Sequence, residues 1–72
     1  MTGKLDRLLA IEGYDDVVDL FAEVLSDSVS PGICINPGCD YTTEVEPDQD
    51  RGYCENCHTQ TVQSALILAG LI

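Results

Sequence analysis

Large aromatic side chains are scarce in this 72-residue chain, which contains no Trp, one Phe and three Tyr. A chain of this length buries only a small core, and such domains are marginally stable unless a metal ion, disulfides or a partner adds to their stability. We therefore expect one small domain whose folding depends on something besides hydrophobic burial.

Basic residues are also scarce, since three Lys and Arg oppose thirteen Asp and Glu and give a net charge of −10. Such a surface repels phosphates, and Lys4, Arg7 and Arg51 form no basic patch in the sequence. The composition argues against direct nucleic-acid binding. It suits a basic protein partner, although an acidic surface can also serve solubility alone.

Long apolar segments are missing as well. The first ten residues include Lys4, Asp6 and Arg7 and contain no apolar run of signal-peptide length. The apolar residues 65–72 are far fewer than the roughly twenty that a membrane-spanning helix needs. We expect a cytoplasmic protein without a membrane segment, in which cysteines remain reduced.

Cysteines are the most informative residues present. Cys34 and Cys39 form a C-x4-C pair, and Cys54 and Cys57 form a C-x2-C pair after an insert of fourteen residues. Each pair fits one tight turn, here called a knuckle, and two facing knuckles can complete a tetrahedral four-thiolate site. The insert is long enough to form a two-stranded hairpin.

The spacing predicts one structural Zn2+ ion. Iron, free cysteines and two disulfides are the alternatives.

A structural zinc ion contributes about 10 to 16 kcal/mol of apparent binding free energy in small finger-like peptides, so we expect folding to require the metal. A closed four-cysteine site leaves no coordination position for a substrate, and the sequence carries no catalytic motif. We therefore expect no catalytic residues and no enzymatic activity. His58 adjoins Cys57 and could replace a thiolate, but adjacent side chains rarely reach one ion, so a structural or surface role is favoured.

Two helices are predicted before the cysteines. Leu5, Leu8 and Leu9 recur at helical spacing within residues 3–12, and Gly13 would end that helix. A longer helix is predicted over residues 15–27, with Asp15 and Asp16 near its start. Its apolar face comprises Val17, Leu20, Phe21, Val24 and Leu25.

The opposite side of the second predicted helix carries an acidic stripe, formed by Asp16, Asp19, Glu23 and Asp27. One interpretation is a solvated face opposite a buried one, which is the usual role of such charge runs. The other is a binding surface for a basic protein partner.

Turn residues divide the remainder of the chain. Residues 28–32 are predicted to be a linker because Pro31 stops a helix. Residues 41–46 are predicted to be a strand and residues 47–52 a loop. Asp40 and His58 follow the two knuckles, where a positive φ angle is often required. Residues 59–62 fit a third strand or a helix start.

The last segment, residues 61–72, is apolar, and we expect a short C-terminal helix there. Its excess of apolar surface would either pack on the second helix or stay partly exposed as a patch that pairs two copies of the chain or docks a partner. The predicted fold is therefore a small α+β metal-bound domain with a helical segment over residues 1–30 that packs on a zinc ribbon with an apolar C-terminal helix over residues 31–72.

Residues 30–72 resemble a family of small uncharacterised zinc-ribbon proteins of bacteria and their phages. The resemblance rests on Gly32-Ile33-Cys34, Cys39-Asp40-Tyr41-Thr42, Val45-Glu46-Pro47-Asp48, Gly52-Tyr53-Cys54-Glu55-Asn56-Cys57 and Thr61-Val62-Gln63-Ser64-Ala65-Leu66. It implies a zinc site at Cys34, Cys39, Cys54 and Cys57, and no biochemical role. His58 departs from the family pattern, in which such knuckles usually have Gly.

Three functions fit these features. The first is a zinc-stabilised interaction or regulatory module that presents acidic surfaces to a protein partner. The second is a phage-type inhibitor, such as an anti-CRISPR or anti-restriction protein, that mimics nucleic-acid charge and binds a basic nucleic-acid-handling protein. The third is a rubredoxin-like electron carrier with iron in the four-cysteine site.

Overall fold

The structure is a computed structural model that describes residues 3–71. Its first two elements are the helices α1 (Lys4–Glu12) and α2 (Val17–Asp27). Gly13 ends α1 with a φ of 82°, and its amide donates to the Leu9 carbonyl. The carboxylate of Asp16 caps α2 by accepting from the amides of Val18 and Asp19. Both predicted helices are confirmed.

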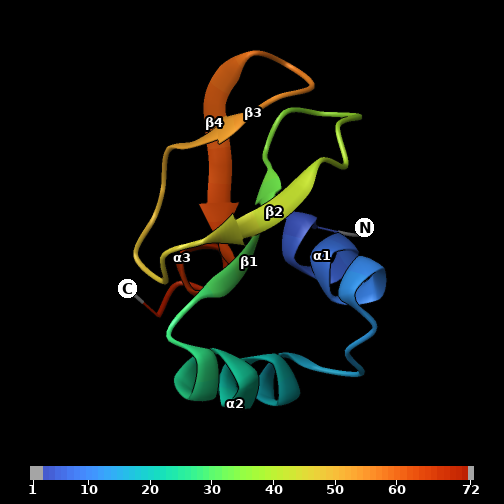
Figure 1. The fold of residues 1–72 in the computed structure, drawn as a ribbon. Coiled ribbons are helices and arrows are strands. Elements are labelled where there is room, and N and C mark those ends of the chain that lie inside the picture. Colours follow the sequence, from blue (N-terminus) through green and yellow to red (C-terminus); the bar gives the residue numbers. More distant parts are fainter. Residues whose placement is uncertain (1–2, 72) are drawn as a thin grey trace.

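A four-stranded antiparallel sheet follows, formed by β1 (Ser30–Cys34), β2 (Thr42–Val45), β3 (Gly52–Cys54) and β4 (Thr59–Ser64). The strand order is β2-β1-β4-β3, with β1 and β4 in the middle. Each knuckle is the turn between two paired strands, so the first joins β1 to β2 and the second joins β3 to β4. The chain is thus a small α+β fold with helices followed by a curled sheet (Figure 1).

The predicted hairpin within the fourteen-residue insert is wrong. Its two strands, β2 and β3, form opposite edges of the sheet, and each pairs with the strand across its own knuckle. Loop length does not decide this, since six residues separate β2 from β3 and seven separate β1 from β2; β2 and β3 pair instead with the two central strands, β1 and β4. Pairing of β1 with β4 then joins the two hairpins.

The predicted linker over residues 28–32 is also partly wrong, because β1 begins at Ser30. Pro31 has no amide hydrogen, yet it is tolerated here because the pairing of β1 with β4 starts only at Gly32. The turn that ends α2 is made instead by Ser28, whose φ of 62° is left-handed.

Glycine allows the sheet to curl. A Cβ atom on Gly32 would lie 2.9 Å from Val45 Cγ2 and 2.9 Å from Val62 Cγ1. A Cβ atom on Gly52 would lie 3.2 Å from Val45 Cγ1. The side chain of Val45 on β2 therefore packs over β1 and against β3, which brings the two edges of the sheet toward each other.

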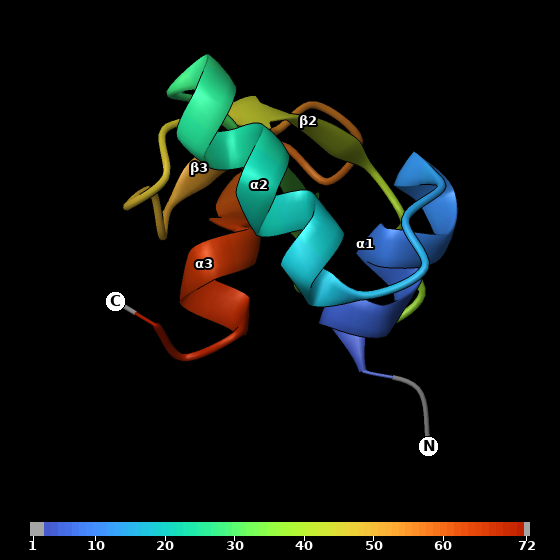
Figure 2. The ribbon, with the colours of Figure 1, turned by 90° about the horizontal axis from the view of Figure 1, so that it is seen from below.

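Two clusters of buried side chains lie on the two faces of β1. Ile33 lies in the helix-side cluster, and its neighbour Cys34 lies in the cysteine cluster on the other face. The helix-side cluster also contains Leu8, Leu20, Val24 and Ala65. From below, α2 crosses between α1 and α3 (Figure 2). The apolar face predicted for α2 is correct at Leu20 and Val24 but wrong at Leu25, which is 85% exposed.

The C-terminal helix is shorter than predicted, because β4 continues to Ser64 and α3 covers only Ala65–Leu68. Two buried serines hold α3 in place: Ser30 Oγ accepts from the Ala65 amide, and Ser64 Oγ accepts from the Ile67 amide. Leu66 and Leu68 pack on the helix-side core, while Leu71 is exposed. Ile72 lies outside the described residues. None of the helices in residues 3–71 combines the length and apolar character required to cross a bilayer.

Candidate metal centre

The four cysteines come from the two hairpins. Cys34 ends β1 and Cys54 ends β3, so each lies where a strand enters its knuckle. Cys39 leaves the first knuckle after a turn in which its amide donates to the Asn36 carbonyl, with Gly38 at a φ of 80°. Cys57 lies in the turn before β4. The pairing of β1 with β4 brings the two knuckles together.

The sulfur atoms of all four cysteines lie within 4.8 Å of one another. The Cys39 and Cys54 sulfurs are 3.8 Å apart, and those of Cys34 and Cys57 are 3.9 Å apart. A tetrahedral site with zinc–sulfur bonds of about 2.3 Å places its sulfurs about 3.8 Å apart. The four cysteines are free thiols and could hold a metal ion between them.

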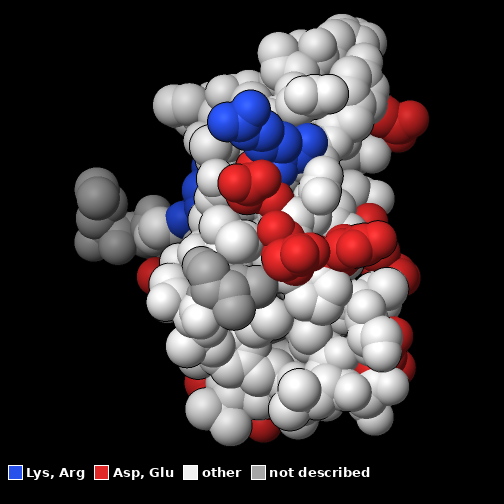
Figure 3. All heavy atoms as spheres, turned by 90° about the vertical axis from the view of Figure 1, so that its left-hand side faces the viewer, with Lys and Arg blue, Asp and Glu red and all other residues white. Residues whose placement is uncertain are grey.

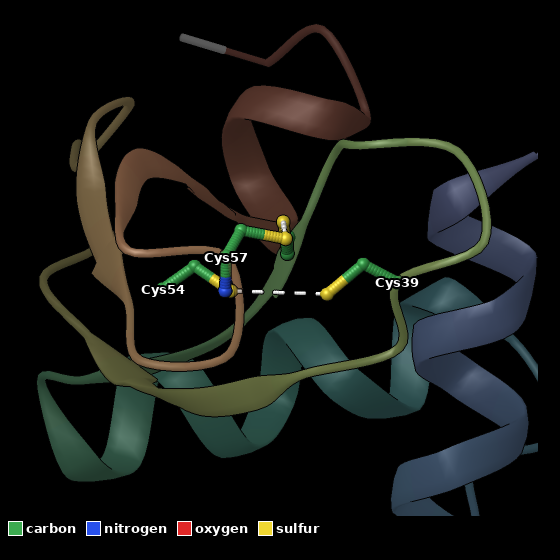
Figure 4. Close-up of side chains that lie close together, drawn as sticks. Cys39, Cys54 and Cys57 are labelled. Atoms are coloured by element: carbon green, nitrogen blue, oxygen red, sulfur yellow. Dashed lines mark hydrogen bonds between the residues drawn. The ribbon is translucent and has the colours of Figure 1, made fainter.

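Figure 4 shows the labelled side chains of Cys39, Cys54 and Cys57 converging from the two knuckles. Cys34, Cys39 and Cys54 are buried, and Cys57 is half-buried. The site is therefore shielded on most sides and open to solvent mainly near Cys57.

Polar groups around the sulfurs are placed to donate hydrogen bonds to thiolates. The Cys57 amide donates to Cys54 Sγ over 3.3 Å, and the Asn56 side-chain amide donates to Cys39 Sγ over 3.4 Å. The Thr61 hydroxyl lies 3.0 Å from Cys34 Sγ, where it can donate as well. Such bonds stabilise negative charge on sulfur and orient metal ligands.

The pKa values of the thiols differ because their surroundings differ. Donation from Asn56 and from the Tyr41 backbone lowers the pKa of Cys39 to about 6. Burial raises the pKa of Cys54. At Cys57 the Asn36 amide favours the thiolate, but the bond to Cys39, burial and the other thiols outweigh it and raise the pKa to about 11. A divalent cation would favour the thiolate form of every ligand.

His58 is not among the described residues that the structure brings together at the sulfur cluster. It is exposed, and its Nδ1 lies 3.2 Å from the Tyr53 hydroxyl. Its φ of 60° agrees with the prediction that the residue after the second knuckle is left-handed. The same prediction for Asp40 is wrong, because the left-handed residue of the first knuckle is Gly38.

Helix α1 contacts the first knuckle through two cations. The Lys4 ammonium donates to the Cys39 carbonyl. The guanidinium of Arg7 forms an ion pair with the Asp40 carboxylate at 2.8 Å and holds the pKa of that carboxyl below its usual range. No sequence pattern indicates these contacts, because the partners are separated by 35 positions (Lys4 and Cys39) and by 33 positions (Arg7 and Asp40).

The acidic stripe predicted on α2 is exposed along its length. Asp16 differs from the other members, because it precedes the helix and its carboxylate is used as the N-terminal cap. Asp19, Glu23 and Asp27 lie on the helix itself, and Glu23 and Asp27 border a hollow that faces β1 and β2.

Comparisons with protein-family models, curated proteins and solved structures found no match to this chain.

Proposed function

We propose that this chain is a small zinc-stabilised protein-interaction module of the zinc-ribbon type, acting in the cytoplasm and binding a basic segment of a protein partner. The observation that carries the metal part is the convergence of four sulfurs within 4.8 Å, with donors directed at three of them. Zinc is favoured because it accepts four thiolates in a closed tetrahedral site.

The distribution of charge supports the interaction part. Two of the three cations in the sequence, Lys4 and Arg7, form intramolecular contacts with the first knuckle. On the face drawn in Figure 3, acidic side chains gather in a band beside a group of basic ones, and the lower part is mostly uncharged. A concentrated negative field attracts a basic partner and accelerates its association.

Native mass spectrometry of freshly purified protein tests the metal part. We expect one zinc ion per chain with all four cysteines reduced. An iron ion, together with the red colour of an iron–thiolate centre, would instead support an electron carrier. A metal-free mass lighter by about four hydrogens would indicate two disulfides and would contradict the proposal.

Calorimetric titration of the zinc-loaded chain tests the interaction part. We expect saturable binding of a Lys- and Arg-rich peptide that weakens with added salt, and no binding of a matched peptide with Glu at the same positions. DNA should compete with the chain for the basic peptide, since both are acidic and bind the same cationic side chains. If neither peptide binds, the interaction part is wrong while the metal part stands on its own test.

A further inference from the structure

Strand β2 has one free edge. It is the first strand in the order β2-β1-β4-β3, and within residues 3–71 no strand pairs with its outer side. An unpaired edge presents backbone N–H and C=O groups that can accept an added strand from another chain. In Figure 1, β2 lies at the front of the sheet.

The register identifies the backbone groups on that free edge. The Cys34 amide donates to the Tyr41 carbonyl over 2.9 Å, in line with the pairs Gly32↔Thr43 and Ser30↔Val45. Bonded and non-bonded pairs alternate along an antiparallel ladder. The N–H and C=O groups of Thr42 and Glu44 therefore point away from β1, toward the free edge.

Two acidic hollows border β2, and Glu44 lines both of them. The sheet-side hollow, of about 550 Å3, opens between β2 and β3 and is bordered by Tyr41, Glu46, Tyr53 and Glu55. The helix-side hollow, of about 370 Å3, is bordered by Glu12, Tyr14, Glu23, Asp27 and Glu44. Among the described residues, no Lys or Arg lines either hollow.

Burial and the carboxylates of Glu23, Glu12 and Asp27 raise the pKa of Tyr14, which reports the negative field in the helix-side hollow. Tyrosine rings beside carboxylates also favour cations, because guanidinium and ammonium groups stack on aromatic faces. Tyr53 is 52% exposed and offers such a face in the sheet-side hollow.

We propose that an extended, Lys- and Arg-rich segment of a partner protein adds as a strand to the free edge of β2, along the sheet-side hollow between β2 and β3, where its cations meet the carboxylates of both hollows. Side chains of an extended segment alternate between the two faces of a sheet, so every second residue of the added strand would point toward the helix side, where Glu44 borders the helix-side hollow. Charge complementarity selects a basic segment over an acidic or apolar one. This inference rests on the proposed function and assigns it a surface.

Amide hydrogen exchange of the zinc-loaded chain tests the inference directly. The probe is a synthetic peptide of about eight residues made of Lys, Arg and Thr, long enough for a typical strand. At saturation we expect the amides of Thr42 and Glu44 to exchange about tenfold more slowly or better, because the peptide backbone accepts from them. A peptide with Pro at alternate positions should give no such protection.

Two double variants, each of which removes two negative charges, test whether the carboxylates of the hollows bind the peptide. Glu44→Gln with Glu46→Gln should weaken binding of the basic peptide by about fivefold or more. Asp15→Asn with Asp50→Asn removes the same charge from exposed positions that border neither hollow, and should change affinity less than about twofold.

The inference would be overturned if the peptide slowed amide exchange only in α2, or if the two double variants lost equal affinity for the peptide. Either result would leave the interaction function intact. Protection of Thr42 and Glu44 that rises with protein concentration in the absence of peptide would indicate that two copies pair through β2, which also overturns it. Absence of any peptide binding would overturn both the inference and the interaction part of the function.

Discussion

At the residue scale, the candidate metal centre depends on small polar side chains as much as on its cysteines. Asn56 and Thr61 place donors within 3.4 Å and 3.0 Å of the sulfurs of Cys39 and Cys34. The motif spacing predicts the ligands but contains nothing that identifies these donors, since their roles arise only where the knuckles meet. Of these donors, only Asn56 could have been predicted from the sequence, because it lies inside the C-x2-C turn.

Replacement of Cys54 by Ser should abolish metal binding and unfold at least residues 32–60. Cys54 is fully buried, and its sulfur accepts the Cys57 amide besides being a candidate ligand. The loss approaches the binding free energy of a structural zinc, about 10 to 16 kcal/mol. NMR amide dispersion and metal content measure the effect, and Ser26→Ala on the exposed side of α2 is the control. Unchanged spectra with a full complement of metal would contradict the assignment.

Removal of the Asp16 carboxylate should destabilise α2. Asp16→Ala leaves the amides of Val18 and Asp19 without their acceptor and should lower the free energy of unfolding by about 0.5 to 2 kcal/mol. Asp16→Asn keeps an oxygen acceptor and should cost much less. Urea unfolding of the zinc-loaded protein measures both changes. Equal destabilisation by the two variants would mean that Asp16 stabilises α2 through its charge and not through the hydrogen bonds of the cap.

At the element scale, close approach between strands determines the shape of the sheet. Val45 of β2 reaches across Gly32 of β1 to Gly52 of β3, and a side chain at either glycine would meet it. This arrangement curls the sheet and creates the hollow between its two edges. Glycine at these positions therefore serves packing, because neither residue has a positive φ angle.

Gly32→Ala should destabilise the protein by about 1 to 3 kcal/mol through overpacking. The added Cβ atom would lie 2.9 Å from both Val45 Cγ2 and Val62 Cγ1 and 3.0 Å from the Gln63 carbonyl oxygen. Gly3→Ala is the control, since a Cβ atom there meets nothing within 4 Å. Thermal unfolding of the zinc-loaded protein compares the two variants. Equal stability of Gly32→Ala and the parent would show that the strands separate without cost.

Helix α1 is held to the first knuckle by its cations, so its stability should depend on Lys4. Lys4→Met keeps the aliphatic stem but leaves the Cys39 carbonyl without its charged donor, at a cost on the order of 1 to 3 kcal/mol. Faster amide exchange in α1 and faster zinc transfer to a chelator should both follow. Arg51→Met, which removes an equal charge from an exposed loop, is the control. If both variants lose zinc equally fast, the contact contributes nothing to the site.

At the scale of the whole molecule, folding and metal binding should be one process. The helix-side core contains five buried side chains, and the second cluster consists of three buried cysteines with Val62. Without metal, that second cluster would have to bury thiols at close range with little else to hold them together. Chelation of the metal should therefore unfold the sheet rather than leave an empty folded site.

Acidification should release the metal, because protons compete with it for the thiolates. The surroundings of Cys57 raise its pKa to about 11, so metal binding displaces its proton throughout the neutral range. The pKa of Cys39 is about 6, so that thiol adds to the pH dependence only below this value. Affinity and stability should fall together between about pH 8 and pH 5, and more steeply at the lower end. Native mass spectrometry and circular dichroism across this range measure both, and a pH-independent metal content would contradict thiolate ligation.

The sequence by itself determined the two N-terminal helices and the cluster of four cysteines. Helical periodicity, the Asp16 cap, the Gly13 stop and the paired cysteine spacing are local signals, and local signals act through turns that close few residues. Tertiary structure decided which strands pair, how far the last helix extends and which part of α2 is buried. Those outcomes depend on the meeting of β1 with β4, on Val45 packing over two glycines and on two buried serines that fix α3. Contacts of this kind join residues far apart in the chain, so no local pattern records them.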